Sequence, residues 1–333
     1  MASITIRDIA ERLGVSETAV SFAINNQPGI SDETRAKILK EVERTNYKPR
    51  KSKTSKGKIA LVLSMRLSAE RENPIFSEIL DSIYKEAEKS GYQVDLIYFT
   101  KGSELSKVDL GKQDGILILG TNLRADNVLP LTKMGKPLVV MDNSFKNLPV
   151  NTVSLDNHGG IASAVNHLSK KGHTKIGYVK SVSNIQNFIE RYTEFVRVAA
   201  ELDLDIIDTI SVGMSPAGAY TEMCQWLENN KPKVTALVTD NDYIALGVMR
   251  ALKEHGIVVG QDISIIGFDD LQYSHISDPP LTTVRIFGER IGSTSFKRLL
   301  EVIGDPEQPH SHISIGTKLI IRDSVHKISS EET

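Results

Sequence analysis

From Ile59 onward the chain alternates short apolar runs with longer amphipathic segments, and this alternation constrains the fold more than any other feature of the sequence. The apolar runs have the length of buried strands, and the segments between them have the spacing of helices. Such alternation predicts an α/β fold in which helices cover both faces of parallel sheets. Residues 59–333 are more than a single hydrophobic core usually holds, so we expect two lobes with a cleft between them.

The boundaries of these elements follow from the pattern. Strands are expected at 59–64, 94–99, 115–120, 137–142, 152–156, 175–180, 206–212, 236–240, 264–269 and 313–323. Helices are expected at 74–91, 158–172, 191–204, 215–230, 243–256 and 288–303.

The N-terminal residues have a different pattern, typical of three short helices. Thr5 and Asp8 match a capping box, and apolar residues follow at helical spacing. Ser16 is placed to cap a second helix after a tight turn, and Ser31 to cap a third that ends near Asn46. This arrangement is typical of an all-α helix-turn-helix domain over 1–48, although a small structural three-helix bundle would have the same pattern.

A helix-turn-helix places the exposed face of its second helix in the major groove of DNA. The candidates for DNA contact in this region are Thr5, Ser16, Glu17, Thr18, Ser21, Phe22 and Asn25. Phe22 is the unusual member, because a large aromatic residue on this face either meets thymine methyl groups or packs against the protein. Glu17 either accepts a hydrogen bond from cytosine or points to solvent.

Charge divides the chain in the same place. Residues 1–58 hold 12 Lys and Arg against 7 Asp and Glu, whereas residues 59–333 hold 28 against 35. A basic linker is expected over 49–58, and its Arg50, Lys51 and Lys53 are further candidates for DNA contact. A solvated spacer that hardly touches DNA is the alternative.

The run TIRDIAERLGVSETAVSFAINNQPGISDETRAKILKEVERTNYKP resembles the DNA-binding domain of the lactose/galactose repressor (LacI/GalR) family. The rest resembles that family's effector domain, whose fold is that of periplasmic sugar-binding proteins. Its landmarks are Asn73-Pro74-x-Phe76, Val153-x-x-Asp156-Asn157-x-x-Gly160, Asp262-Ile263-Ser264-x-x-Gly267-Phe268-Asp269-Asp270 and Pro280-Leu281-Thr282-Thr283. The resemblance implies an N-terminal lobe of about 59–155 and 284–314, and a C-terminal lobe of about 156–283 and 315–329.

The ends of three strands offer a binding site, because ligands of parallel sheets lie beyond the carboxyl ends of the strands. Asp142, Asp242 and Asp269 fall at or just after such ends, and Arg191 stands at the start of an expected helix. The resemblance places effector contacts at all four positions, although Asp242 could equally cap a helix. It also suggests Asn73, Phe76 and Met214 as contacts.

Some positions depart from the family pattern. Glu194 replaces a common glycine and Ile286 replaces a common glutamine, so the identity of the effector stays open. Relatives follow Tyr-x-Pro with a hinge helix whose leucine wedges into the minor groove. The basic linker of this chain has no leucine or alanine, so we expect it to contact phosphates without a wedge.

Other classes of protein are disfavoured. Cys224 is the only cysteine, and the sequence shows neither a secretory signal nor a long apolar run, so a cytoplasmic location without membrane contact is expected. Common catalytic motifs such as G-x-G-x-x-G and G-x-S-x-G are missing, so neither enzymatic activity nor a cofactor or metal is expected.

The sequence therefore predicts a homodimeric transcriptional regulator, with repression as the default. It would bind a near-palindromic double-stranded operator and respond to a sugar or sugar derivative between its lobes. The leucine heptads of tetrameric relatives are absent near the C-terminus, so no larger oligomer is expected. A pure sugar-binding protein and a sugar-metabolising enzyme are the alternatives, and whether the effector releases or tightens DNA binding stays open.

Overall fold

The computed structural model describes residues 4–24, 29–45, 47, 55–64, 74–99 and 110–328. The chain divides into two compact units, residues 1–55 and 56–333. Five predicted contact residues lie outside the described residues: Asn25, Arg50, Lys51, Lys53 and Asn73. Residues 49–54 of the predicted linker lie outside them as well.

The described end of the predicted linker needs a correction. Strand β1 (Gly57–Ser64) begins before residue 58, where the linker was expected to end. Its first two residues pair in parallel with the start of β2 (Tyr92–Phe99). The Lys58 amide also donates to the Asp114 carboxylate at 2.7 Å, so backbone pairing orders residues that composition alone assigned to the linker.

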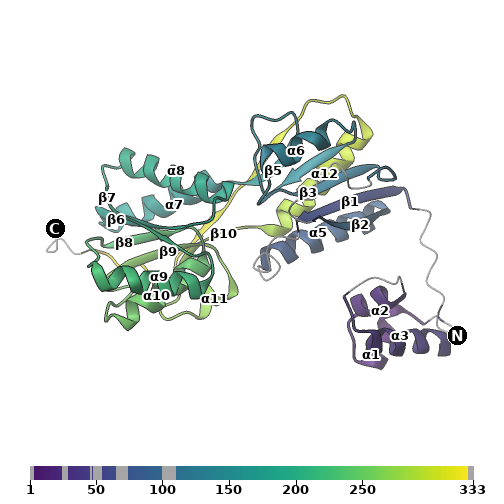
Figure 1. Cartoon of the computed structure of the whole chain (residues 1–333), viewed down its shortest axis with the longest axis horizontal. Coiled ribbons are helices and arrows are strands. Elements are labelled where there is room, and N and C mark those ends of the chain that lie inside the picture. The colour runs from purple at the N-terminus through teal and green to yellow at the C-terminus, as the bar shows by residue number, and fades with distance from the viewer. Residues whose placement is uncertain are drawn as a thin grey trace. The chain divides into compact units, whose positions relative to one another are not determined.

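The first unit consists of three helices, α1 (Ile6–Leu13), α2 (Glu17–Ile24) and α3 (Asp32–Arg44), shown in purple in Figure 1. The Thr5 hydroxyl accepts from the Asp8 amide at 3.2 Å, and the Asp8 carboxylate accepts from the Thr5 amide at 2.7 Å. Ser16 accepts from the Ala19 amide at 3.1 Å, and Ser31 caps α3 in the same way. The predicted caps are confirmed.

A tight turn brings α1 and α2 together. Gly14 ends α1 in the left-handed conformation, with φ 64°, which a glycine adopts without strain. The core of the unit is formed by the fully or almost fully buried side chains of Ile9, Ala10, Val20, Ala23 and Ile38. These residues come from all three helices, so the first unit has a hydrophobic core of its own.

The second unit contains two six-stranded sheets, one in each lobe. The N-terminal lobe has the order β11-β5-β4-β3-β1-β2, with β3 at Gly115–Leu119, β4 at Leu138–Met141, β5 at Asn151–Leu155 and β11 at His312–Ile315. The C-terminal lobe has the order β12-β10-β9-β8-β6-β7, with β6 at Lys175–Ser181, β7 at Asp205–Val212, β8 at Ala236–Thr239, β9 at Ser264–Asp269, β10 at Thr282–Arg285 and β12 at Lys318–Ile320. Apart from the antiparallel pair of β10 and β12, these strands run parallel, so the predicted fold class is confirmed.

Helices cover both faces of each sheet. The N-terminal lobe carries α5 (Pro74–Ser90), α6 (Ala125–Thr132) and α12 (Gly288–Gly304). The C-terminal lobe carries α7 (Asn157–Lys170), α8 (Gln186–Glu201), α9 (Pro216–Asn229), α10 (Asp242–Glu254) and the short α11 (Gln272–Ile276). The hydrophobic clusters lie on either side of the sheets, between strands and helices. In the described part of the chain, no helix is long and apolar enough to cross a membrane.

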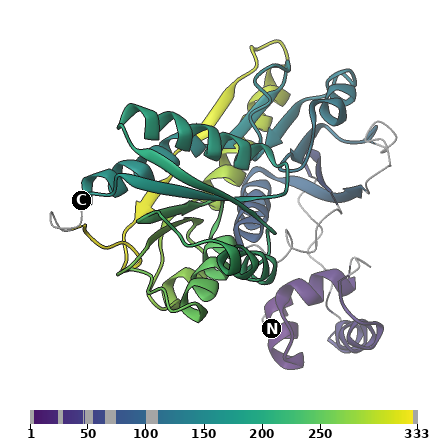
Figure 2. The same cartoon turned by 60° about the vertical axis from the view of Figure 1, so that its left-hand side comes forward.

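The chain passes between the lobes three times. It crosses at Asp156 between β5 and α7, at residues 286–287 between β10 and α12, and at residues 316–317 between β11 and β12. The Asp156 amide donates to the Ile315 carbonyl at 2.9 Å, which ties the first crossing to the third. Figure 2 shows the yellow C-terminal segment running from one lobe into the other. Strand β10 stays in the C-terminal lobe through Arg285, two residues beyond the expected crossing.

Further features differ from the sequence-based expectations. Helix α8 begins at Gln186, five residues before the expected start, so Arg191 lies in its second turn. The strand expected over 313–323 is two strands in different lobes, because the chain crosses between them. Helices α6 and α11 were not expected, since α6 contains a proline and α11 has only five residues.

The small core of the first unit should make it sensitive to a cavity. Ile38 is fully buried, so Ile38→Ala should destabilise the first unit by about 2–5 kcal/mol. In limited proteolysis of the full chain, residues 1–55 should be digested faster while the second unit resists. Leu39→Ala, at a neighbouring side chain that is 40% exposed, is the matched control. Equal digestion of both variants would contradict this assignment of the core.

Candidate functional site

Helix α2 presents its polar residues outward. Glu17 and Thr18 in its first turn are exposed, as is Ser16 just before the helix, and Ser21 is partly exposed. On the opposite face, Val20 and Ala23 are buried in the core of the unit and fix the orientation of the helix. The exposed face thus has the short side chains that base contacts in a major groove require.

Phe22 is only partly exposed, because its ring lies against the backbone of Gly29. A Cβ atom on Gly29 would lie 2.9 Å from Cε2 of Phe22, and Gly29 has φ 126°, so only glycine fits there. The Phe22 carbonyl also accepts from Nη1 of Arg35 at 3.0 Å. Packing therefore explains why part of the Phe22 ring is buried. Contact of the exposed part with a base stays a prediction.

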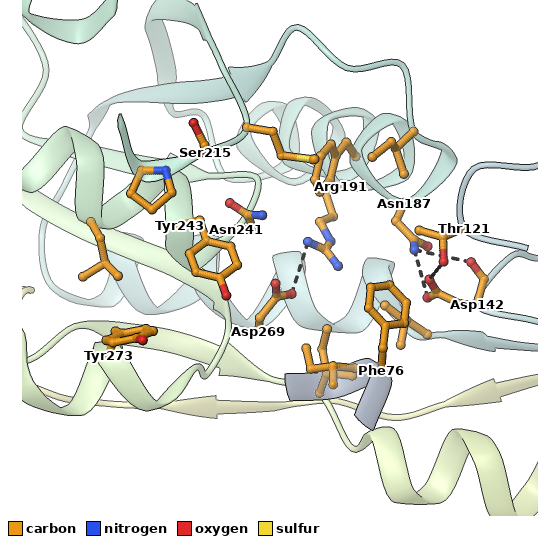
Figure 3. A pocket seen from close by; sticks show the side chains of 18 of the residues that line it. Phe76, Thr121, Asp142, Asn187, Arg191, Ser215, Asn241, Tyr243, Asp269 and Tyr273 are labelled. Carbon is orange, nitrogen blue, oxygen red and sulfur yellow. Dashed lines mark hydrogen bonds and ion pairs between the residues drawn. The ribbon is translucent and has the colours of Figure 1, made fainter. Parts of the chain in front are cut away.

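In the second unit, a cavity of about 840 Å³ lies between the lobes (Figure 3). Its polar residues include Thr121 after β3, Asp142 after β4, Asn241 after β8 and Asp269 at the end of β9. The carboxyl ends of parallel strands meet here, as expected for a ligand site in such sheets. Arg191 reaches the cavity from α8.

Arg191 is the charged centre of the cavity and is only 2% exposed. Its Nε donates to Oδ1 of Asn157 at 2.9 Å, and its Nη1 lies 3.6 Å from Oδ1 of Asp269. Its Nη1 also donates to the carbonyl of Asp240. The guanidinium stacks 3.6 Å from the centre of the Phe268 ring, so hydrogen bonds, the nearby Asp269 carboxyl group and a cation–π contact stabilise the buried charge.

Asp269 lies next to Arg191 in the same lobe. Burial, opposed by Arg191 and reinforced by nearby carboxylates, raises the pKa of Asp269 to about 8. Its backbone has φ 121°, a region that favours glycine and costs a non-glycine residue energy. A raised pKa and a strained backbone at one carboxylate are typical of functional positions.

Asp142 lies on the N-terminal side of the cavity. Its Oδ2 accepts from the Thr121 hydroxyl, and its Oδ1 accepts from Nδ2 of Asn187 at 3.0 Å. Burial raises the pKa of Asp142, and the hydrogen bonds from Thr121 and Asn187 oppose this increase. Figure 3 shows these three side chains together at one end of the cavity.

Phe76 and Met214 also line the cavity, as predicted from the sequence. Asn187, Tyr243 and Tyr273 line the cavity too, and little in the sequence indicated them, because each is the second residue of a helix and none is a carboxylate at a strand end. Asn241 could have been found, since it lies between a strand and a helix.

Asp242 does not line the cavity, and this corrects the sequence-based grouping. It is fully buried and accepts hydrogen bonds from the Leu271 amide at 2.8 Å, the Ser274 hydroxyl at 2.6 Å and the Thr283 hydroxyl at 2.5 Å. Its neighbour Asn241 caps α10 and faces the cavity instead. Asp242 therefore holds the loop after Asp269 in place through hydrogen bonds inside the C-terminal lobe.

Glu194, the departure from the family pattern, also lies away from the cavity lining. It is buried and pairs with Nδ1 of His158 at 2.9 Å and with Nη2 of Arg197 at 2.5 Å. The other departure, Ile286, does line the cavity. An apolar residue thus stands where relatives often have an amide.

Two family models match the chain. "Bacterial regulatory proteins, lacI family" matches residues 5–50, and "Periplasmic binding protein-like domain" matches residues 165–325. The transcriptional repressor PurR of Haemophilus influenzae is 32% identical over 97% of this chain and 99% of its own length. The chain belongs to the lacI family of bacterial regulatory proteins. It is therefore a DNA-binding transcriptional regulator with an effector domain, in a family that consists of regulators and not of enzymes.

Solved structures share the fold of this lacI-family chain. A crystal structure of the Lac repressor dimer bound to operator and the anti-inducer ONPF has a TM-score of 0.73 and 24% identity, and the match covers 98% of this chain and 100% of that one. The complex of the regulator CelR with cellobiose has a TM-score of 0.71 and 23% identity, over 96% and 99% of the two chains. These likenesses confirm the two-lobed architecture.

The raised pKa of Asp269 predicts a pH-dependent gain in stability for Asp269→Asn. The native state keeps the proton of Asp269 up to about pH 8, whereas the ordinary carboxyl loses it near pH 3.8. Between these values the carboxyl group is ionised in the unfolded chain but protonated in the native state, so the free energy of unfolding of the wild type falls as the pH rises. Asparagine does not ionise and avoids this cost. We expect little Tm gain at pH 4 and a clear gain at pH 8, measured by calorimetry.

The matched control is Asp205→Asn, at an exposed aspartate of the same lobe. It should show no gain that grows with pH. A Tm gain for Asp269→Asn that is the same at pH 4 and pH 8 would contradict the raised pKa.

Proposed function

We propose that this regulator is a homodimeric repressor, whose affinity for a near-palindromic operator is controlled by an uncharged polyhydroxylated molecule, such as a sugar. The observation that carries the effector part is the pair of Arg191 and Asp269 in a cavity between two lobes. An arginine and a carboxylate together can donate to and accept from the hydroxyls of one ligand. A ligand that contacts both lobes favours their closed arrangement, which links binding to a change in shape.

The charges of the cavity support an uncharged ligand. Among the described residues that line it, Arg191 is the only basic one, and it already faces Asp269. Asp142 also lines the cavity, and Asp240 and Asp242 lie close enough to Asp269 to raise its pKa. Arg191 would be the only cation that a phosphate or carboxylate group meets among these described lining residues, and its guanidinium already donates to Asn157 and Asp240. The anion would therefore lose its hydration at a substantial cost, which one occupied partner offsets poorly.

The size and the apolar walls of the cavity support a ligand larger than a single small sugar. A volume of about 840 Å³ falls in the upper part of the range for small-molecule sites. Phe76, Phe188, Tyr243 and Tyr273 supply aromatic surfaces on which the apolar faces of sugar rings can pack. The structural neighbour CelR holds the disaccharide cellobiose, which agrees with this size.

The DNA-binding part of the proposal places α2 in the major groove. A two-fold dimer presents two copies of α2, so each half-site of a near-palindrome meets the same side chains. The Lac repressor, which shares this fold, was solved as a dimer on its operator. Of the predicted contacts, Thr18 and Glu17 are exposed, and Phe22 is partly exposed. Thr5, which caps α1, is exposed as well.

The second candidate function, a sugar-binding protein without DNA binding, leaves the first unit without a role. The exposed polar face of α2 and the match of residues 5–50 to the lacI family both favour a regulator. Selection of bound duplexes from a random DNA library separates the two functions, because a pure sugar-binding protein enriches no sequence.

Phe22→Ala should relax base preference at one position in each half-site. If the exposed part of the ring contacts a thymine methyl group, its loss should cost about 1–3 kcal/mol of discrimination there. Competition binding against single-base variants of the selected operator measures this effect. Leu39→Ala, at an exposed apolar residue of α3, should leave every preference unchanged. If Phe22→Ala also leaves them unchanged, Phe22 serves packing alone.

Neutral sugars, and disaccharides above all, should raise the Tm of the protein, whereas sugar phosphates should not. At a ligand concentration of 100 Kd the stabilisation is about 2.7 kcal/mol, which a thermal-shift screen detects easily. Arg191→Ala should weaken binding of the sugar that responds by about 1.5–3 kcal/mol, because charge-assisted hydrogen bonds are lost. Met214→Ala, in the same cavity, should weaken it less. A response to sugar phosphates alone would overturn the proposal.

A further inference from the structure

Side-chain hydrogen bonds join the two lobes across the cleft, in addition to the three crossing segments. Asn187 Nδ2 donates to Oδ1 of Asp142 at 3.0 Å, as Figure 3 shows. The Ser144 hydroxyl donates to Oε1 of Glu190 at 3.0 Å. Asp142 and Ser144 follow β4 in the N-terminal lobe, whereas Asn187 and Glu190 lie in the first turns of α8 in the C-terminal lobe. These four residues form an inter-lobe bridge.

Asn157 contacts both α8 members of the inter-lobe bridge. Its Nδ2 donates to Oδ1 of Asn187 at 2.9 Å and to Oε2 of Glu190 at 2.9 Å. Its Oδ1 accepts from Nε of Arg191 at 2.9 Å. Asn157 is fully buried, so water cannot replace these partners without a cost. One amide group therefore holds the bridge with its donors and the cavity arginine with its acceptor.

The position of Asn157 in the chain adds a second argument. It is the first residue of α7 and directly follows Asp156, where the chain crosses between the lobes. The Asp156 amide is bonded to the Ile315 carbonyl of another crossing segment. A rotation of one lobe against the other turns about these segments, so it acts on Asn157 before it acts on the rest of α7.

We propose that Asn157 is a positioning residue that couples Arg191 in the cavity to the inter-lobe bridge. The inference rests on the proposed role of Arg191 in effector binding. Any displacement of the guanidinium moves the acceptor atom of Asn157, and the two donors of the same amide transmit this movement to Asn187 and Glu190. Loss of these donors loosens the bridge and opens the lobes.

An isosteric exchange tests this arrangement. Asn157→Asp keeps an oxygen for Arg191 but turns the donor toward Asn187 and Glu190 into an acceptor, which repels both. Adding Glu190→Gln supplies a donor for that oxygen, while the remaining oxygen of the new side chain still accepts from Ser144. The double variant has the net charge of the wild type, with the amide and the carboxylate exchanged.

The matched control lies on the same helix. Asn166→Asp makes the same chemical change in α7, where Asn166 Nδ2 donates to the Ala162 carbonyl of its own helix at 2.7 Å, its one hydrogen-bond partner among the residues that the structure describes. Ser144→Ala is a second test variant, which removes one bond of the bridge without changing a buried residue. It keeps the proposal testable if Asn157→Asp fails to fold.

The experiment measures the separation of the lobes in the full chain without any sugar. Nitroxide labels on cysteines that replace Lys133 and Lys231, both exposed and in different lobes, give this distance by pulsed electron paramagnetic resonance. Cys224 is replaced by serine, and unlabelled protein dilutes the sample so that pairs between subunits are rare. Asn157→Asp and Ser144→Ala should shift the mean distance to longer values, and Asn166→Asp should not.

The double variant Asn157→Asp with Glu190→Gln should recover at least half of the shift, since a structural defect alone would not be reversed by a second substitution. Arg191→Lys, which removes the Nε donor, should shift the distance in the same direction as Asn157→Asp. The proposal is overturned if the Asn157→Asp and Ser144→Ala distances match the parent, if the double variant recovers nothing, or if Arg191→Lys has no effect. Because no sugar is present, a failed sugar screen overturns the proposed effector without changing these results.

Discussion

The second unit depends on the contacts that stabilise the buried charge of Arg191. A guanidinium that is 2% exposed is stable only if protein groups replace its contacts with water, and these groups come from distant parts of the chain. Asn157 begins α7, Phe268 and Asp269 end β9, and Asp240 follows β8. The geometry of one side chain therefore fixes the relative positions of two strands and two helices of the C-terminal lobe, and it places the resulting polar surface in the cleft.

Much of this architecture was predictable because apolar periodicity is a local property. The strand that ends just before Asp142 and the strand that ends at Asp269 were both expected from their apolar runs, and the rule that ligands lie beyond strand ends brought their carboxylates together. The caps at Thr5 and Ser31 followed from spacing alone. The strands and the caps themselves were each expected from residues within a few positions of one another.

The rest depends on tertiary contacts that no local pattern contains. Asp242 resembles Asp269 in the sequence, yet three donors from residues 271, 274 and 283 take up its oxygens. The hydrogen bonds of Asn187 connect it to residues in another helix and in another lobe. Phe22 packs against Gly29, whose positive φ cannot be read from the residue type alone. In each case the decisive partner is set by the fold.

The three crossings also determine when each lobe can be completed during synthesis. The N-terminal lobe contains β1 and β2, but its sheet needs β11 and one of its faces needs α12, which follow the last residues of β10. A ribosome therefore translates almost all of the C-terminal lobe while the N-terminal lobe still has an open sheet edge and an uncovered apolar face. Such surfaces are prone to aggregation in a nascent chain. The N-terminal lobe can complete its fold only after residues near the end of the chain are made. The two lobes therefore complete their folds together.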